Sequence, residues 1–453
     1  MTGAPTTGSP AGDAETALPA PADRVLLVYP PVYDTRLNWA QWQQPSLLLR
    51  LARHLRAAGS DVRLIDAVAH RPRERLRRSR VEILDADGQR VHRWRFGPTA
   101  AAIAAELRAL AKAGWQPDLV YVECQVTPWW EGVAEVVRLV RQRFPAARVV
   151  AVGAYARLAP AHARAHAGVD DLLPGLPARI ARLAADLTVY PHVPTHALVS
   201  LGADREPEDL VEEVRAKAAK RVHHFAIADH APASRCRDRF REVLAALRDA
   251  RLGLNFYALG NIAASDLVDQ PDLAELMRAA GYVQICFADD RDQPMTAACD
   301  EQIVAAYRVA AERCRAAGFV PRTDALVGGI CVGRRGEDLE SRARLMTRIT
   351  GAVGSVIVWP YQPTPAECLR DLPLQLQNGK LFPLRAENGL TYGDYMGLVG
   401  LSAILNAKHR DVTFDFLGDG LIPRLFRDSI ARSGWEPPSE VKGTMQLPVL
   451  VGR

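Results

Sequence analysis

Apolar and polar residues divide the chain into two stretches in which short apolar runs alternate with helical periodicity. In the first stretch, continuous apolar runs predict strands at 24–29, 61–66, 119–123, 148–152 and 169–173. Runs of this length are typical of strands buried on both faces of a sheet. Helical spacing predicts helices between them, notably at 46–58, 131–143 and 178–186. Strands alternating with helices indicate a doubly wound parallel sheet with right-handed crossovers.

One segment of the first stretch breaks this alternation. Residues 81–96, VEILDADGQRVHRWRF, alternate apolar and polar positions about the dipeptide Asp87-Gly88. Alternation around an Asp-Gly pair predicts a β-hairpin.

From Thr195 onward, a strand pattern followed by a helix pattern recurs six times. The predicted strands are 196–201, 222–228, 253–259, 283–287, 323–328 and 355–359. The predicted helices are 206–219, 237–250, 272–280, 300–317 and 337–350, followed by a C-terminal region with helices at 392–407 and 421–433. Six such units within about 165 residues predict an incomplete (β/α) barrel.

Composition narrows the class of protein. The chain has 453 residues, 48% of them hydrophobic, and a net charge of +5. Its seven cysteines are scattered without any C-x-x-C, which argues against zinc or iron–sulfur sites made from local ligands and favours a reduced, cytoplasmic protein. No apolar run approaches the ~18 residues that span a bilayer. The arginine-rich segment 71–80 has no accompanying nucleic-acid motif, so no nucleic-acid partner is expected.

Aromatic and amide residues follow the strands of the first stretch, at the sheet edge where doubly wound proteins bind ligands. Together they suit a large, flat ligand with an amide fringe, although tryptophans there would equally serve to cover the sheet end. No G-x-G-x-x-G follows the first strand, so a dinucleotide is not expected.

Polar residues likewise follow the strands of the second stretch. Asp229 beside His230 suits acid–base chemistry, and Asp289 and Tyr257 are further catalytic candidates. Capping of the following helices is the structural alternative for each of them. No spacing typical of metal ligands is present, so no metal site is predicted.

The first stretch resembles the cobalamin-binding domain of B12-dependent radical SAM proteins over about 160 residues. The resemblance rests on the order of Pro30-Pro31, Pro45-Ser46-Leu47, the polar segment 125–127 and the turn Gly153-Ala154. Alanine at 154 and leucine at 176 depart from the family, and its D-x-H-x-x-G motif is absent. The resemblance implies cobalamin contacts at Pro31, Tyr33, Trp39, Trp42, Gln44, Ser46, Gln125, Thr127, Trp129, Gly153, Ala154 and Tyr155.

The second stretch resembles the radical SAM barrel, through AIADHA, ELMRAAGYVQICFADD and CRAAGFVPRTDALVGGICVGRRGEDLE. In that family the loop after the first barrel strand carries C-x-x-x-C-x-x-C, whose thiolates hold a [4Fe–4S] cluster. The corresponding segment here, SLGADREP at 200–207, is short and has no cysteine. The resemblance therefore implies a degenerate member without the cluster and without radical cleavage of S-adenosylmethionine.

These patterns predict an α/β protein with four parts. They are a disordered tail (1–22), a Rossmann-like cobalamin-binding-type domain (23–190), a radical SAM-like (β/α)6 barrel (195–368) and a helical C-terminal region (369–453). The expected function is non-radical, cobalamin-dependent methyl transfer to a small molecule in specialised metabolism, with S-adenosylmethionine as a further possible cofactor. Asp229 or His230 would take the substrate proton. The alternatives are a non-catalytic protein that stabilises a radical SAM partner, and a barrel with unrelated chemistry that binds neither cofactor.

Overall fold

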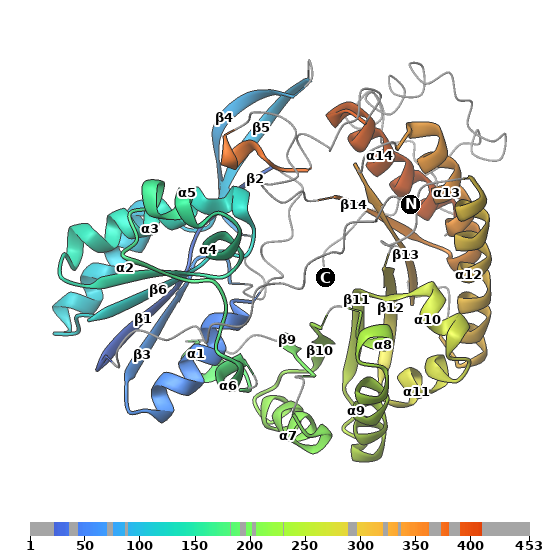
Figure 1. The fold of residues 1–453 in the computed structure, drawn as a ribbon, viewed down its shortest axis with the longest axis horizontal. Helices are drawn as coiled ribbons and strands as arrows, with labels where there is room; N and C mark the ends of the chain where they lie inside the picture. The colour runs from blue at the N-terminus through green and yellow to red at the C-terminus, as the bar shows by residue number, and fades with distance from the viewer. Residues whose placement is uncertain are drawn as a thin grey trace, which may run out of the picture.

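The computed structural model describes two parallel sheets and one small antiparallel sheet (Figure 1). It describes residues 22–35, 44–69, 76–86, 89–181, 183–190, 196–201, 205–229, 231–288, 297–319, 325–333, 337–361, 373–379 and 390–409. The protein is thus a mixed α/β protein built on parallel sheets, which confirms the fold class at that level.

The first sheet has five parallel strands in the order β3-β1-β6-β7-β8. They are β1 (Arg24–Tyr29), β3 (Asp61–Asp66), β6 (Leu119–Glu123), β7 (Arg148–Val152) and β8 (Asp171–Leu173). Counted among themselves these strands run 2-1-3-4-5, so the order reverses between β1 and β6. Ligands of doubly wound sheets bind outside the carboxyl ends of the strands at such a switch point.

Helices of the first half cover both faces of this sheet (Figure 1). They are α1 (Ser46–Ala57), α2 (Ala100–Lys112), α3 (Trp130–Arg143), α4 (Ala154–Leu158), α5 (Pro160–His166) and α6 (Ala178–Ala181), with single turns η2 (Thr127–Trp129) and η3 (Leu187–Val189). The prediction of a helix over 178–186 was wrong in length. Asp186 instead caps η3, because its carboxylate accepts a hydrogen bond from the Thr188 amide at 2.9 Å.

The predicted hairpin is confirmed as β4 (Arg78–Ala86) and β5 (Gln89–Phe96), although Asp87 and Gly88 lie outside the described residues. A short strand that was not predicted, β2 (Val32–Asp34), pairs with β5. It escaped prediction because the two prolines before it end the apolar run of β1. The hairpin is held to α3 by ion pairs, in which Arg93 meets Glu131 and Arg95 meets Glu135.

The second sheet has six parallel strands that follow one another in sequence order, with β9 and β14 at its two edges. The strands are β9 (His196–Val199), β10 (His224–Ile227), β11 (Asn255–Ala263), β12 (Tyr282–Ala288), β13 (Leu326–Val332) and β14 (Val356–Pro360). All six predicted strands are therefore present, with shifted ends. The arrangement is a curved sheet with helices on its outer side (Figure 1).

The helices of the second half also follow the predicted order. They are α7 (Pro207–Ala218), α8 (Pro232–Arg235), α9 (Arg237–Ala250), α10 (Ala264–Asp269), α11 (Leu273–Ala279), α12 (Ala297–Ala316), α13 (Leu339–Val353) and α14 (Tyr392–His409), with the turn η6 (Leu374–Leu376) before α14. The short helices α8 and α10 were not predicted. The helix predicted at 421–433 lies outside the described residues.

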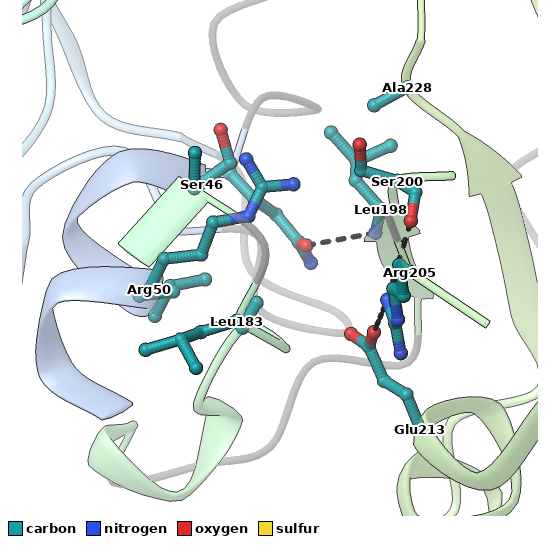
Figure 2. A pocket seen from close by; sticks show the side chains of 12 residues that line it. Ser46, Arg50, Leu183, Leu198, Ser200, Arg205, Glu213 and Ala228 are labelled. Atoms are coloured by element: carbon teal, nitrogen blue, oxygen red, sulfur yellow. Dashed lines mark hydrogen bonds and ion pairs between the residues drawn. The ribbon is translucent and has the colours of Figure 1, made fainter. Parts of the chain in front are cut away.

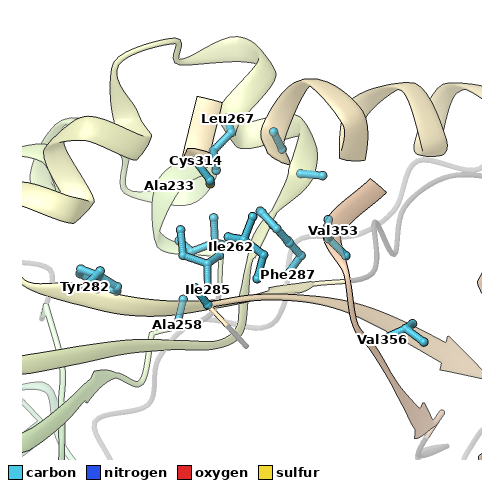
Figure 3. Packing of buried hydrophobic residues seen from close by; sticks show 14 of the residues in the cluster. Ala233, Ala258, Ile262, Leu267, Tyr282, Ile285, Phe287, Cys314, Val353 and Val356 are labelled. Carbon is cyan, nitrogen blue, oxygen red and sulfur yellow. The ribbon is translucent and has the colours of Figure 1, made fainter. Parts of the chain in front are cut away.

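The core of the second half lies between the sheet and these outer helices (Figure 3). Ile285 and Phe287 point from β12 toward the helices, where Cys314 of α12 and Val353 of α13 are also buried. Strands β12 and β13 are buried over most of their length, as expected of a parallel sheet covered by helices. The carboxyl ends of its strands are consequently where a site would form.

Candidate functional site

The two halves meet where α1 approaches the edge strand β9, and Gln44 makes the bond between them. Its Nε2 donates to the carbonyl oxygen of His196 at 2.7 Å, and its Oε1 accepts from the amide of Leu198 at 3.1 Å. The side-chain amide therefore acts as the peptide group of a neighbouring strand and satisfies the exposed edge of β9. Gln44, predicted as a cobalamin contact, uses its side-chain amide to join the two halves.

Removing this amide is expected to loosen the junction. Gln44 is 5% exposed, so Gln44→Leu removes both bonds of a buried side-chain amide to β9, at a cost of about 2–3 kcal/mol. Hydrogen exchange at the Leu198 amide should accelerate, whereas Gln44→Glu, which keeps the acceptor for that amide, should preserve more of its protection. Unchanged exchange at Leu198 in Gln44→Leu would contradict this account.

A small cavity lies at the same junction, with a volume of about 10 Å³, enough for roughly one water (Figure 2). Ser46 and Arg50 of α1 line it from one side, and Leu198 and Ser200 from the other. The Arg50 guanidinium reaches into the junction, as Figure 2 shows, and has no hydrogen bond or ion pair among the residues that the structure describes. Burial lowers the pKa of Arg50, although Glu213 and Asp229 counteract this.

Arg205 fastens the segment in which the resembling family carries its cluster loop. Its guanidinium donates to the carbonyl oxygens of Ser200 at 3.3 Å and Asp209 at 2.6 Å, and pairs with the Glu213 carboxylate at 2.5 Å. Glu213 also pairs with Lys217, and all three charged side chains are buried. Burial opposes ionisation of Glu213, yet Lys217 and Arg205 hold its pKa below its usual value. The turn between β9 and α7 is thus held by a buried ion-pair network.

Asp229 stands at the carboxyl end of β10, as predicted, but both of its oxygens are engaged. One accepts from the Ser200 hydroxyl at 2.9 Å and the other from the Leu201 amide at 2.7 Å. These bonds tie the end of β9 to the end of β10. Asp229 therefore acts as a structural tie between the ends of the two strands. His230 and Asp289 lie outside the described residues.

Tyr257 is not at the strand end, where the sequence placed it. It is the third residue of β11 and is in register with Ala226, three residues before Asp229. The prediction was wrong because β11 continues to Ala263, through irregularities in its pairing with β12. The Tyr257 hydroxyl lies 3.0 Å from Nδ1 of His224, and burial raises the pKa of Tyr257. Asp229 and Tyr257 therefore do not form one acid–base pair.

Four of the predicted cobalamin contacts use their polar groups within the protein. Trp129 donates through Nε1 to Asp34 at 3.2 Å, and the Tyr33 hydroxyl donates to Glu135 at 2.5 Å. The Tyr155 hydroxyl lies 2.9 Å from Nδ1 of His162, and Gln125 donates to Glu123. Trp129 consequently covers the sheet end, the structural alternative for the tryptophans. Trp39 and Trp42 lie outside the described residues.

The remaining predicted contacts belong to the backbone turns at the carboxyl ends of the strands. Gly153 has φ of +100°, and a Cβ there would lie 3.1 Å from the carbonyl oxygen of Cys124. Ala154 begins α4, Thr127 is buried in η2, and Pro31 packs against Gly132 of α3. Ser46, like Gln44, lines the junction cavity. These residues share one edge of the first sheet, as the strand pattern predicted.

Glu123, the last residue of β6, was not among the predicted site residues. Its carboxylate is fully buried and accepts a hydrogen bond from the Leu48 amide at 3.1 Å, so it occupies the amino end of α1. A helix amino end otherwise attracts bound anions. Burial raises the pKa of Glu123 from 4.5 to about 7, although hydrogen bonds from Gln125, Leu48 and Leu47 lower it. The sequence signal that could have identified Glu123 is a glutamate at the end of an apolar strand, in the segment VYVE.

A segment of the C-terminal region covers this edge of the first sheet. The turn η6 packs against η2, and Leu374 joins the core of the first half. Asn378 donates to the buried Asp34 carboxylate at 2.9 Å, and Trp130 donates to Gln375 at 3.4 Å. The switch point is therefore closed by the protein's own chain.

The described cysteines do not gather into a site. Cys124, Cys286, Cys314 and Cys331 are buried and Cys236 is exposed, all as free thiols. No group of three or more His, Cys, Asp or Glu side chains able to hold a metal ion occurs in the described ranges. Of the helices that the structure describes, none is both long and apolar enough to cross a membrane.

Comparison with known proteins gives no family. No protein-family model and no curated protein matches the chain. Among solved structures, the carboxyl transferase domain of Rhizobium etli pyruvate carboxylase with 3-hydroxypyruvate is similar at 11% identity and a TM-score of 0.21. The alignment covers 90% of this chain and 54% of that one, so the chain spans about half of that structure. A TM-score this low carries no conclusion about fold or function.

Proposed function

We propose that the protein binds an anion-bearing small molecule at the junction of its two parallel sheets, with Arg50 receiving the anion. The observation that carries the proposal is the Arg50 guanidinium, which reaches the junction cavity without a partner among the described residues. Guanidinium groups bind carboxylates and phosphates through paired N–H donors.

The charges around the junction favour an anion. Arg50, Arg205 and Lys217 face the carboxylates of Glu213 and Asp229 in this region. Glu123 is the third carboxyl group near Arg50, but with a pKa of about 7 it is partly protonated at neutral pH. A partly buried cluster with excess positive charge is stabilised by an added negative group, because an uncompensated buried charge is costly.

Both cofactors implied by the sequence resemblance carry such a group. Cobalamin has a phosphodiester in its nucleotide loop, and S-adenosylmethionine has a carboxylate. The described residues do not fit the corrin ring, however, because the polar groups of Tyr33, Gln125, Trp129 and Tyr155 are engaged by other residues of the protein. We therefore derive no cobalamin-dependent step. Non-radical methyl transfer stays a proposal that rests on the sequence resemblance.

The test is calorimetric titration of hydroxocobalamin, S-adenosylmethionine and inorganic phosphate, each separately, into three proteins. These are the wild type, Arg50→Gln and the matched control Arg53→Gln, which removes an exposed arginine from the same helix. At least one ligand should bind the wild type and the control equally, and bind Arg50→Gln about tenfold more weakly or worse, since a charge-assisted hydrogen bond is lost.

The three ligands distinguish the source of the anion. Retention of hydroxocobalamin through gel filtration, with a base-off visible spectrum, would support the cobalamin assignment. Binding of phosphate alone would indicate a simple anion site. No binding of any ligand, or binding that does not depend on Arg50, would refute the proposed function.

A second candidate is a non-catalytic role beside a radical SAM partner. The observation that favours it is that Asp229 accepts hydrogen bonds from Ser200 and Leu201, together with the Arg205 bonds that fix the segment after β9. Residues at the carboxyl ends of β9 and β10 thus stabilise the fold. Retained folding together with the absence of ligand binding would favour this candidate.

A further inference from the structure

Helix α5 carries two histidines one turn apart, His162 and His166. No metal site was expected from the sequence, which holds this pair in the segment HARAH. Residues four positions apart lie on one face of a helix, and other proteins bind metal ions with two histidines at this spacing. The two imidazole ring centroids lie 4.3 Å apart. Two imidazoles bonded at right angles to one ion place their centroids about 4.5 Å apart, so this separation fits a shared ion.

The ring nitrogens of the pair are mostly available to a ligand. Nδ1 of His162 lies 2.9 Å from the hydroxyl of the buried Tyr155. Nε2 of His162 and both nitrogens of His166 make no hydrogen bond to the residues that the structure describes. The Trp130 ring meets the His162 ring edge to face at 4.8 Å and helps to hold it. Metal-bound histidines commonly have their second nitrogen held by a hydrogen bond in this way.

The protonation state of the pair also suits a metal ion, because only neutral imidazole is a ligand. Burial and the neighbouring His166 lower the pKa of His162. Two imidazolium groups this close would repel each other. Arg138 and Arg141 line the open space beside His166 and oppose a cation. Arg141 is paired with Asp170, however, and Arg138 is exposed, where solvent and salt screen its charge.

We propose that His162 and His166 form a binding site for a divalent transition-metal ion, with water completing its coordination. Imidazole suits Zn²⁺, Ni²⁺ and Cu²⁺, and Cu²⁺ binds a given site most tightly of the three. In the described ranges no third His, Cys, Asp or Glu side chain joins the pair, so protein ligands leave positions on the ion open. This site is separate from the Arg50 junction and does not depend on the proposed function.

The test is calorimetric titration of Cu²⁺ into the full-length protein in mildly alkaline buffer. His162→Gln and His166→Gln should each bind the ion about tenfold more weakly or worse, since a single imidazole remains. The control His223→Gln removes an exposed histidine before β10 and should bind as the wild type does, within about twofold. Arg50→Gln should also keep the affinity, which separates this site from the junction. Far-UV circular dichroism checks that each variant is folded.

Tryptophan fluorescence locates the bound ion. The Trp130 ring centroid lies 4.8 and 6.1 Å from the centroids of His162 and His166, so Cu²⁺ bound there should quench Trp130 emission. Trp130→Phe should reduce the quenching and keep the calorimetric affinity. Affinity should fall in mildly acidic buffer, because protons compete for the imidazoles. Wild-type affinity in both His162→Gln and His166→Gln, an equal loss in His223→Gln, or unchanged quenching in Trp130→Phe would overturn the proposal.

Discussion

Gly132→Ala is expected to destabilise the protein by about 3 kcal/mol or more, since inserting a methyl group into packed backbone costs this order of free energy. A Cβ at Gly132 would lie closer than 3.0 Å to the carbonyl oxygen of Pro31, which is main chain and cannot rotate away. Helix α3 would have to leave the carboxyl end of β1. Urea denaturation should show the loss as a lower midpoint.

The matched control is Gly351→Ala in helix α13, where a Cβ would meet no atom within 4 Å. Helix propensity alone predicts that alanine stabilises both helices by about 0.5–1 kcal/mol. Tertiary contacts should therefore give the two substitutions opposite signs. If Gly132→Ala raised the midpoint as Gly351→Ala does, the close packing of α3 on Pro31 would be wrong.

Folding stability should fall by about 3 kcal/mol as the pH rises through the titration of Glu123, since each unit of pKa difference corresponds to about 1.4 kcal/mol. Burial raises its folded pKa to about 7, against 4.5 for an unperturbed glutamate. Between these values the folded state holds the proton and the unfolded state does not. The contribution of Glu123 is therefore fully present below 4.5 and is lost as the pH passes 7.

Glu123→Gln isolates this contribution, because the amide stays neutral while its oxygen can still accept from the Leu48 amide. The difference in free energy of unfolding between wild type and variant should change by about 3 kcal/mol between pH 4.5 and a pH above 7. Other carboxylates titrate equally in both proteins and cancel. A difference that does not vary with pH would show that folding does not raise the pKa of Glu123.

The strands were predictable because strands buried in a parallel sheet have continuous runs of apolar residues in the sequence. The limits of β1, β3, β6 and β7 agree with the sequence patterns at every residue, and α9 begins and ends where helical spacing placed it. Prediction failed where the signal depends on tertiary pairing. Strand β2 forms because β5 lies beside it, and β11 extends to Ala263 because β12 continues its ladder.

The sequence predicted where the candidate site residues lie in the fold, but it did not predict which hydrogen bonds they make. The strand pattern placed Gln44, Ser46, Gln125 and Trp129 near one sheet edge, and it placed Asp229 at the end of a strand of the second sheet. Whether each polar group faces a ligand or another residue depends on neighbours that are distant in sequence. Gln44 bonds β9 from 152 and 154 positions away, and Glu123 bonds α1 from 75.

The sequence by itself determined the alternation of strands and helices, the parallel sheets, and the absence of a cysteine motif after β9, because these are local patterns. The tertiary structure alone decided that Arg205 holds that turn, that Asp229 and Glu123 serve the fold, and that Arg50 reaches the junction without a described partner. The physical reason is that a buried polar group needs a hydrogen-bond partner. Which residue becomes that partner depends on how the two halves pack, because the partner is often distant in sequence.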